Sequence, residues 1–481
     1  MQTFFWHYYE TSGADPYRDR PLQFAGIRTT PELEIVDTPV MFYARPPRDA
    51  LPHPDACLIT GITPQHAERE GLAEAEFAAR VHEQLAVPGT CTVGYNSLRF
   101  DDEFTRHMLY RNFYEPYARE WENGNSRWDL IDLVRMCHAL RPEGIEWPTR
   151  DDGTPSFRLE HLARANHLEQ EHAHDALSDV HALIGLARLL RVRQPRLWAW
   201  YFALRRKQRV FDLLDVVGMT PLVHVSSRYA ASRRCLALIA PIAQHPSRSG
   251  EVIVCDLATD PAEWLALDED DIADRIFTPR ADLPEGVERI PLRTVRVNHA
   301  PALAPLSVLQ GVDHARLQLD VASCLAHRDT LRAAEGLAEK LRRVFQRAAE
   351  RPPAEDPELA LYGGGFLSDA DKPLLARVRA TPPALLGTSA FPFRDPRYAE
   401  LLFRYRARNW PETLDAAETA RWDAFRHARL TRHSALSVLT LDDYFARLDV
   451  LRHDPLAQGK LPLLDQLQAW GEQLAADVLP A

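Results

Sequence analysis

The chain has 481 residues, of which 46% are hydrophobic and 26% are charged, a composition typical of a globular protein and not of a disordered chain. Its formal net charge of −11 excludes a protein that coats nucleic acid through overall basicity. A local basic groove remains compatible with this charge, because binding follows the charge of a patch. The length predicts about two to four domains.

The six cysteines are scattered, and none forms a CxxC pair or another zinc-like spacing. This pattern is typical of a reduced, intracellular protein. The first residues, MQTFFWHYYE, lack the basic and apolar regions of a signal peptide. No apolar run is long enough for a transmembrane helix. We therefore expect a cytoplasmic protein without a membrane partner.

The first 194 residues predict an α/β domain. An aromatic-rich strand is expected at Phe4–Glu10, and a second strand at Cys91–Tyr95. A helix should then carry Phe104, Met108, Leu109 and Phe113. Near the end of the domain, apolar residues from Ala176 to Leu190 recur at helical spacing.

The next region, 195–352, has short strand-like runs separated by turn residues, which predicts a small β domain with helical insertions. These runs are Pro221–Val225, Cys235–Ile239, Glu251–Cys255 and Ile290–Val297. One amphipathic helix is expected from Leu331 to Ala348.

A proline-rich stretch at Arg351–Pro357 resembles a linker. The remainder, 353–481, predicts a helical domain, with helices around 413–430, 441–452 and 462–477.

Acidic residues and a histidine are distributed so that they can form a site for phosphodiester cleavage. Residues 8 and 10 of the first strand share a face, because strand side chains alternate. Two magnesium ions about 4 Å apart can stabilise both the attacking and the leaving oxygen, and Mg²⁺ prefers carboxylate ligands. A histidine ahead of a helix, such as His174, can act as general base on water, and Asp179 lies one turn into that helix.

The order Glu10, Asp101, His174 and Asp179 resembles the DEDDh exonucleases, which have a ribonuclease-H-like fold. Longer strings resemble the bacterial exodeoxyribonuclease I family and extend from residue 4 to beyond residue 400. Examples are Leu58–Pro64, Asn125–Leu130, Leu140–Ile145, Ser156–His161 and Tyr405–Asn409. The resemblance implies an exonuclease domain, an SH3-like domain and a C-terminal helical domain.

The same resemblance implies a 3′→5′ exonuclease that degrades single-stranded DNA to nucleoside 5′-monophosphates in DNA repair and recombination. Two Mg²⁺ ions, replaceable by Mn²⁺, would be held by Glu10, Asp179 and a first-strand aspartate, with Asp101 completing the acidic site. His174 would activate water. This chain carries Tyr8 where the family has that aspartate. Tyrosine is neutral at pH 7, so we expect impaired catalysis with a retained fold.

Alternative interpretations exist for these residues when they are taken singly. Tyr8 and Glu10 could be ordinary strand residues. Asp101, with Asp102 and Glu103, could be the acidic start of a helix. Asp175 is expected to be a helix-capping residue.

Several residues are candidates for contact with DNA or with a partner. Arg404, Arg406 and Arg408 alternate with aromatic residues, as in single-strand binding sites, although a charged helix face explains them equally well. The family strings imply substrate contacts for a second group, Asn96, Arg99, Phe100, Arg127 and Arg158. The family is also recruited by the C-terminal tail of single-strand-DNA-binding protein, for which Arg141 is the candidate contact. A three-domain clamp that encloses its own substrate favours a monomer.

Two rival functions are also compatible with the sequence. The first is a catalytically inactive protein that binds the 3′ ends of single-stranded DNA, which Tyr8 favours. The second is a related DEDDh enzyme that acts on RNA or short oligonucleotides. The long remainder of the chain after the nuclease domain argues against the second.

Overall fold

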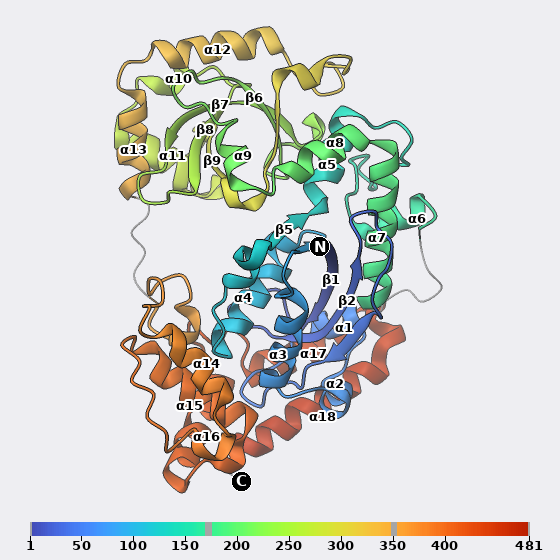
Figure 1. The fold of residues 1–481 in the computed structure, drawn as a ribbon, viewed down its shortest axis with the longest axis vertical. Coiled ribbons are helices and arrows are strands. Elements are labelled where there is room, and N and C mark those ends of the chain that lie inside the picture. Colours follow the sequence, from blue (N-terminus) through green and yellow to red (C-terminus); the bar gives the residue numbers. More distant parts are fainter. Residues whose placement is uncertain (1, 169–175, 348–353, 480–481) are drawn as a thin grey trace. The chain divides into compact units, whose positions relative to one another are not determined.

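The computed structural model describes residues 2–168, 176–347 and 354–479, which form two compact units. One unit comprises Met1–Arg127, Gln170–His181 and Pro353–Ala481, and the other comprises Trp128–Glu169 and Ala182–Pro352. Two five-stranded sheets and the helices of Figure 1 confirm the predicted mixture of an α/β nuclease fold, a small β domain and a helical region.

The first sheet has the strand order β3-β2-β1-β4-β5. Its strands are β1 (Thr3–Thr11), β2 (Pro21–Thr29), β3 (Val40–Tyr43), β4 (Thr90–Gly94) and β5 (Ser126–Asp129). β1 runs antiparallel to β2 and parallel to β4. The aromatic residues of β1 favour a strand, and the strand predicted at Phe4–Glu10 is confirmed.

Helices of the N-terminal segment cover this sheet. They are α1 (Pro54–Thr60), α2 (Pro64–Glu70), α3 (Glu74–Leu85) and α4 (Asp101–Arg111). Both α1 and α2 begin with a proline, where the missing N–H has no helical partner to lose. Phe77 and Val81 of α3 share a buried core with Phe5 and Phe24 of the sheet.

The C-terminal segment of the same unit is helical, as predicted. Its helices are α14 (Lys372–Ala380), α15 (Arg397–Asn409), α16 (Ala416–Thr431), α17 (Leu441–Arg452) and α18 (Leu461–Val478). Reciprocal capping boxes start α16 and α17. Tyr444 of α17 and Trp470 of α18 lie in one core with Leu51 and Cys57, so the C-terminal helices and the region of α1 fold together.

The other unit contains the second sheet, in the order β10-β6-β7-β8-β9, with every neighbouring pair antiparallel. Its strands are β6 (Leu222–Val225), β7 (Leu236–Gln244), β8 (Glu251–Asp256), β9 (Leu292–Arg296) and β10 (Ala302–Pro305). The four strands predicted from the sequence correspond to β6 to β9. The helices assigned wholly to this unit are α5 (Leu130–Leu140), α6 (Leu159–Ala165), α8 (Pro195–Ala203), α9 (Lys207–Phe211), α10 (Ala262–Leu265), α11 (Glu269–Phe277), α12 (Val321–Ala333) and α13 (Leu337–Arg347).

The single helix predicted from Leu331 to Ala348 is wrong. The chain forms two helices there, α12 and α13, because the backbone turns at Ala334 and Gly336 adopts a φ of 71°. Residues on both sides of the break fit one apolar stripe, so periodicity alone did not reveal it. Ala348 lies outside the described residues.

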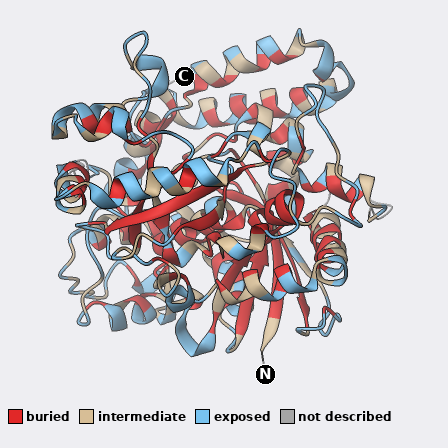
Figure 2. Ribbon diagram, turned by 90° about the horizontal axis from the view of Figure 1, so that it is seen from above, coloured by how far each residue is buried: buried red, intermediate tan, exposed pale blue. Residues whose placement is uncertain are grey.

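Burial follows this architecture. Figure 2 shows the strands coloured as buried along most of their length, with exposed residues on helices and loops. Across the described ranges, no helix is long and apolar enough to span a lipid bilayer.

Candidate functional site

The candidate site begins on β1, where buried and half-buried side chains alternate. His7 and Tyr9 are buried, whereas Tyr8 and Glu10 are half-buried and therefore share the opposite face. In the pairing with β2, Tyr8 lies opposite Ala25 and Glu10 lies opposite Gln23. β4 pairs with β1 in parallel only as far as Trp6, so Tyr8 and Glu10 lie near the carboxyl end shared by both strands.

Asp101, the first residue of α4, is fixed against β1 by one direct hydrogen bond and by two more that run through Thr105. The backbone N–H of Tyr9 donates to Asp101 Oδ1 at 3.2 Å. The Tyr9 hydroxyl and Thr105 Oγ1 are 3.0 Å apart, and Thr105 Oγ1 donates to the Asp101 carbonyl at 2.8 Å. These contacts place the Asp101 carboxylate beside the β1 backbone at the residue between Tyr8 and Glu10.

The turn before α4 brings the other predicted residues toward this end of the sheet. Asn96 adopts a left-handed φ of 62° and precedes the short 3₁₀ helix Ser97–Arg99. Gly94 is required before it, since a Cβ there would lie 2.4 Å from the Cβ of Ser97. Arg99 is exposed, and the Phe100 ring lies 4.9 Å from that of Phe104.

Asp102, unlike the half-buried Tyr8 and Glu10, is buried and bound by arginines. Arg119 contacts it at 2.5 Å and Arg127 at 3.1 Å. Burial alone would raise the pKa of Asp102, but these two guanidinium groups outweigh it and hold the pKa well below its usual range. Arg127 also binds Glu120 at 2.9 Å, so it braces the start of α4.

Asp179 lies in the first turn of α7 (Ala176–Arg193) and is half-buried. The described residues 176–181 belong to the same unit as β1 and α4. His174, the predicted general base, and Asp175, the predicted cap, lie outside the described residues. Within the described ranges, no group of three or more His, Cys, Asp or Glu residues is placed to hold a metal ion.

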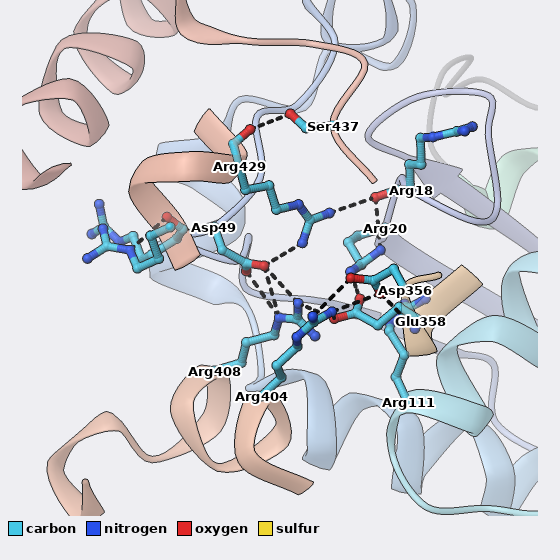
Figure 3. A network of polar contacts seen from close by, with 12 residues as sticks. Arg18, Arg20, Asp49, Arg111, Asp356, Glu358, Arg404, Arg408, Arg429 and Ser437 are labelled. Atoms are coloured by element: carbon cyan, nitrogen blue, oxygen red, sulfur yellow. Dashed lines mark hydrogen bonds and ion pairs between the residues drawn. The ribbon is translucent and has the colours of Figure 1, made fainter. Parts of the chain in front are cut away.

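The three arginines of α15 have a different setting from the one predicted. All three side chains are buried and bound by carboxylates: Arg404 by Asp356, Glu358 and Glu400, Arg406 by Glu418, and Arg408 by Asp49 and Glu358. Figure 3 shows Arg404 and Arg408 meeting these acids from α15. Their hydrogen-bonding capacity is directed into the protein, so the prediction that they contact DNA phosphates is not supported by this geometry.

Arg158 and Arg141 belong to the other unit. Arg158 is exposed, with its nearest carboxylate contact, Glu160, at 3.7 Å. Arg141 donates to the carbonyls of Val308 and Gln310 at 3.1 and 3.2 Å. These contacts fix its guanidinium group near the end of α5.

Sequence reasoning missed a group of exposed aromatic side chains in the first unit. Trp121 is 66% exposed, Tyr362 47% and Phe366 93%. The Tyr117 ring lies between two of them, 6.4 Å from Tyr362 and 6.5 Å from Phe366. The glycine run that separates Tyr362 from Phe366 is a sequence signal for aromatic side chains on an exposed loop.

Comparison with known proteins gives a consistent result over three segments. Residues 5–187 match the family described as exonuclease, residues 205–347 the exonuclease I SH3-like domain, and residues 355–474 the exonuclease I C-terminal domain. The chain is 47% identical over 422 residues to exodeoxyribonuclease I of Escherichia coli strain K12, covering 88% of each chain. It is 43% identical over 473 residues to exodeoxyribonuclease I of Haemophilus influenzae, covering 98% of each.

Solved structures agree over nearly the whole length. A moderately thermophilic exonuclease I from Methylocaldum szegediense has a TM-score of 0.94 and 49% identity, covering 98% of this chain and all of that chain. E. coli exonuclease I bound to a dA16 oligonucleotide has a TM-score of 0.93 and 44% identity, with 98% of this chain and 100% of that one covered.

Two further structures concern metal and protein partners. A zinc-bound complex of the E. coli enzyme with single-stranded DNA has a TM-score of 0.92 and 43% identity, covering 99% of this chain and 100% of that one. A structure of SSB/exonuclease I with the inhibitor CFAM has a TM-score of 0.89 and 42% identity, covering 98% and 100%.

Proposed function

Because this chain belongs to the exonuclease I family, we propose that it acts on single-stranded DNA from the 3′ end and releases nucleoside 5′-monophosphates, in DNA repair and recombination. Its relatives are exonucleases, and one of them has been solved with an oligonucleotide bound. We also propose that cleavage by this chain is slow, because of the residue at position 8.

The observation that carries this proposal is the position of Asp101 against β1. Its carboxylate accepts a hydrogen bond from the N–H of Tyr9, the residue between Tyr8 and Glu10, whose side chains share one face of β1. In a competent family member, an aspartate at position 8 would place a second carboxylate there. Tyr8 instead offers a bulkier phenol, neutral at pH 7 with a reference pKa of about 10.

The residues of this chain fit a two-ion site poorly, because the neutral Tyr8 stands where the family has a carboxylate. Glu10, Asp101 and Asp179 supply the remaining carboxylates of the acidic set. A bound divalent ion would supply charge neutralisation at the phosphate and an activated water. We propose that Mg²⁺ is the ion the family site uses, that this chain holds it weakly, and that an aspartate at position 8 restores binding.

The residues just before α4 are proposed to guide the strand end. Asn96, Arg99 and Phe100 form the turn that follows β4, at the carboxyl end of the sheet. Trp121 and Phe366 are exposed aromatic rings on the same unit, and stacking on such rings binds bases without sequence preference.

A protein partner is also proposed. One similar structure is that of SSB/exonuclease I, and Arg141 is our candidate contact for the tail carboxylate of that partner. Its guanidinium group is already oriented by two backbone carbonyls, and the planar fork of arginine is well suited to a carboxylate. We propose that the chain works as a monomer.

The experiment is digestion of 5′-labelled single-stranded DNA in Mg²⁺ by this chain, by Tyr8→Asp and by Tyr8→Phe. We expect ladders that shorten from the 3′ end with Tyr8→Asp, and little shortening with the other two. Equal shortening by all three would show that position 8 does not limit cleavage.

A second candidate function, favoured by Tyr8 itself, is a 3′-end binding protein without cleavage. It would replace the first if Tyr8→Asp bound single strands but did not cut them. Competition between 3′-hydroxyl and 3′-phosphate strands would then establish whether the end is recognised.

A further inference from the structure

A cavity of about 270 Å³ lies in the first unit, and none of its lining residues belongs to the candidate nuclease site. Its walls come from the loop after β3, the start of α3, and helices α15 and α16. Phe77, Met108, Leu414 and Trp422 give it an apolar interior. Binding sites for small molecules are typically apolar cavities with a few convergent polar groups, and this one is just below the usual lower size of about 300 Å³.

The acids in the cavity lining already have cationic partners. Asp423 and Asp477 contact Arg426 at 3.4 and 3.2 Å. Glu74 contacts Arg111 at 2.8 Å. None of these carboxylates therefore requires a cation from a ligand.

Arg408 and Arg426 of the lining are bound by carboxylates, but the other lining arginines have unused hydrogen-bonding capacity. Arg45 is exposed at the cavity, and within the described ranges its side chain makes no hydrogen bond or ion pair. Arg48 binds Glu68 at 2.5 Å through Nη2, while its buried Nη1 has no hydrogen-bond partner. Deeper in the lining, Arg20 is 3% exposed; its Nε lacks a hydrogen-bond partner but lies 3.7 Å from Glu74 Oε1.

The orientation of Arg48 is fixed by packing. Its guanidinium carbon lies 4.7 Å from the centre of the Trp470 ring, and the ion pair with Glu68 holds the other side of the group. A preorganised guanidinium loses less entropy when it binds an anion.

We propose that this cavity binds a small organic monocarboxylate with an aromatic body. The carboxylate is held by Arg45 and Arg48, and the ring fills the space lined by Phe77, Met108 and Trp422. Charge-assisted hydrogen bonds to a carboxylate satisfy the unused arginine donors, and burial of the ring removes apolar surface from water. This function is independent of DNA cleavage, because the cavity shares no residue with the candidate nuclease site.

The test uses the full chain without added metal and two matched probes, 3-phenylpropionate and 3-phenylpropionamide. Binding is measured by calorimetry and by the rise in melting temperature that a native-state ligand produces. We expect the acid to bind and the amide to bind about tenfold more weakly, since only the acid makes charge-assisted bonds. A peptide ending in phenylalanine distinguishes a chain terminus from a free acid: tighter binding than the free acid identifies the terminus as the source.

Three variants locate the site. Arg45→Gln removes an exposed charge without a buried contact and should weaken binding of the acid about tenfold while leaving the amide unchanged. Thr419→Phe adds bulk at an exposed position of the lining and should weaken both probes. Arg432→Gln changes an exposed arginine outside the lining and serves as the matched control. Equal affinity for acid and amide, or binding of the acid unchanged in both Arg45→Gln and Thr419→Phe, would overturn the proposal.

Discussion

Glu358 provides the sharpest test of what holds the C-terminal helices to the nuclease fold. Its side chain is fully buried and accepts hydrogen bonds from Arg20 at 2.9 Å, Arg404 at 3.0 Å and Arg408 at 2.6 Å (Figure 3). Burial raises the pKa of its carboxyl group, but these arginines outweigh that effect and hold the pKa well below its ordinary value. The carboxylate is therefore charged in the folded protein.

Glu358→Gln preserves the side-chain volume and removes this charge, which leaves buried guanidinium groups without their shared counterion. Breaking one buried ion pair in this way costs about 3–5 kcal/mol, and we expect the loss in unfolding free energy to fall in that range. The matched control is Glu400→Gln. That side chain is 25% exposed and contacts Arg404 and Arg421, so its loss should be under about 1 kcal/mol.

The assay is urea unfolding followed by tryptophan fluorescence, with the unfolding slope compared between variants. A destabilisation by Glu358→Gln no larger than that by Glu400→Gln would refute the reasoning, because it would show that the buried network contributes little. The DNA affinity of both variants should remain close to that of the parent chain at a temperature where all are folded.

Three further predictions follow from buried or exposed groups. Burial lowers the pKa of His7 to about 4 and of His107 to about 3, so between these values and the ordinary histidine pKa of 6.5 only the unfolded chain takes up these protons. The unfolding free energy should therefore be full above pH 6.5 and fall toward pH 4, by up to about 1.4 kcal/mol per pH unit for each histidine. Urea midpoints measure this, and a rise in stability as the pH falls from 6.5 to 5 would contradict it. Phe366→Ala should weaken single-stranded DNA binding by about 1–3 kcal/mol in fluorescence anisotropy if a base stacks there, whereas Leu385→Ala, at another exposed apolar position of the C-terminal segment, should not. Arg141→Ala should reduce affinity for a peptide of the SSB tail without changing digestion of naked DNA, and an unchanged peptide affinity would remove Arg141 from the proposed interface.

Much of the fold could be predicted from local patterns. The strand at Phe4–Glu10 and four of the five strands of the second sheet were recognised because short β-branched and aromatic runs between turn residues leave few alternatives. The face shared by Tyr8 and Glu10 follows from strand alternation alone. The break at Gly336 was missed, since a glycine inside a helical stripe has two interpretations that periodicity does not distinguish.

The arginines of α15, Arg404, Arg406 and Arg408, have partners that local sequence patterns do not predict. Arg408 binds Asp49, which lies 359 residues away in sequence, and no sequence pattern around residue 408 indicates that partner. Alternating arginines and aromatic residues look alike whether they contact phosphates or buried acids. The exposed rings of Trp121 and Phe366 were missed for the converse reason, because exposure depends on what the rest of the chain leaves uncovered.

The most direct test of the central claim is the single-turnover rate at which Tyr8→Asp removes the first nucleotide from a single strand in saturating Mg²⁺. A metal site contributes several kcal/mol of transition-state stabilisation, so we predict a rate at least about 100-fold above that of the parent chain. The gain should disappear in the double variant Tyr8→Asp/Glu10→Gln, which has the new carboxylate without its neighbour on β1. A rate for Tyr8→Asp equal to that of the parent chain would contradict the claim that Tyr8 limits this nuclease site.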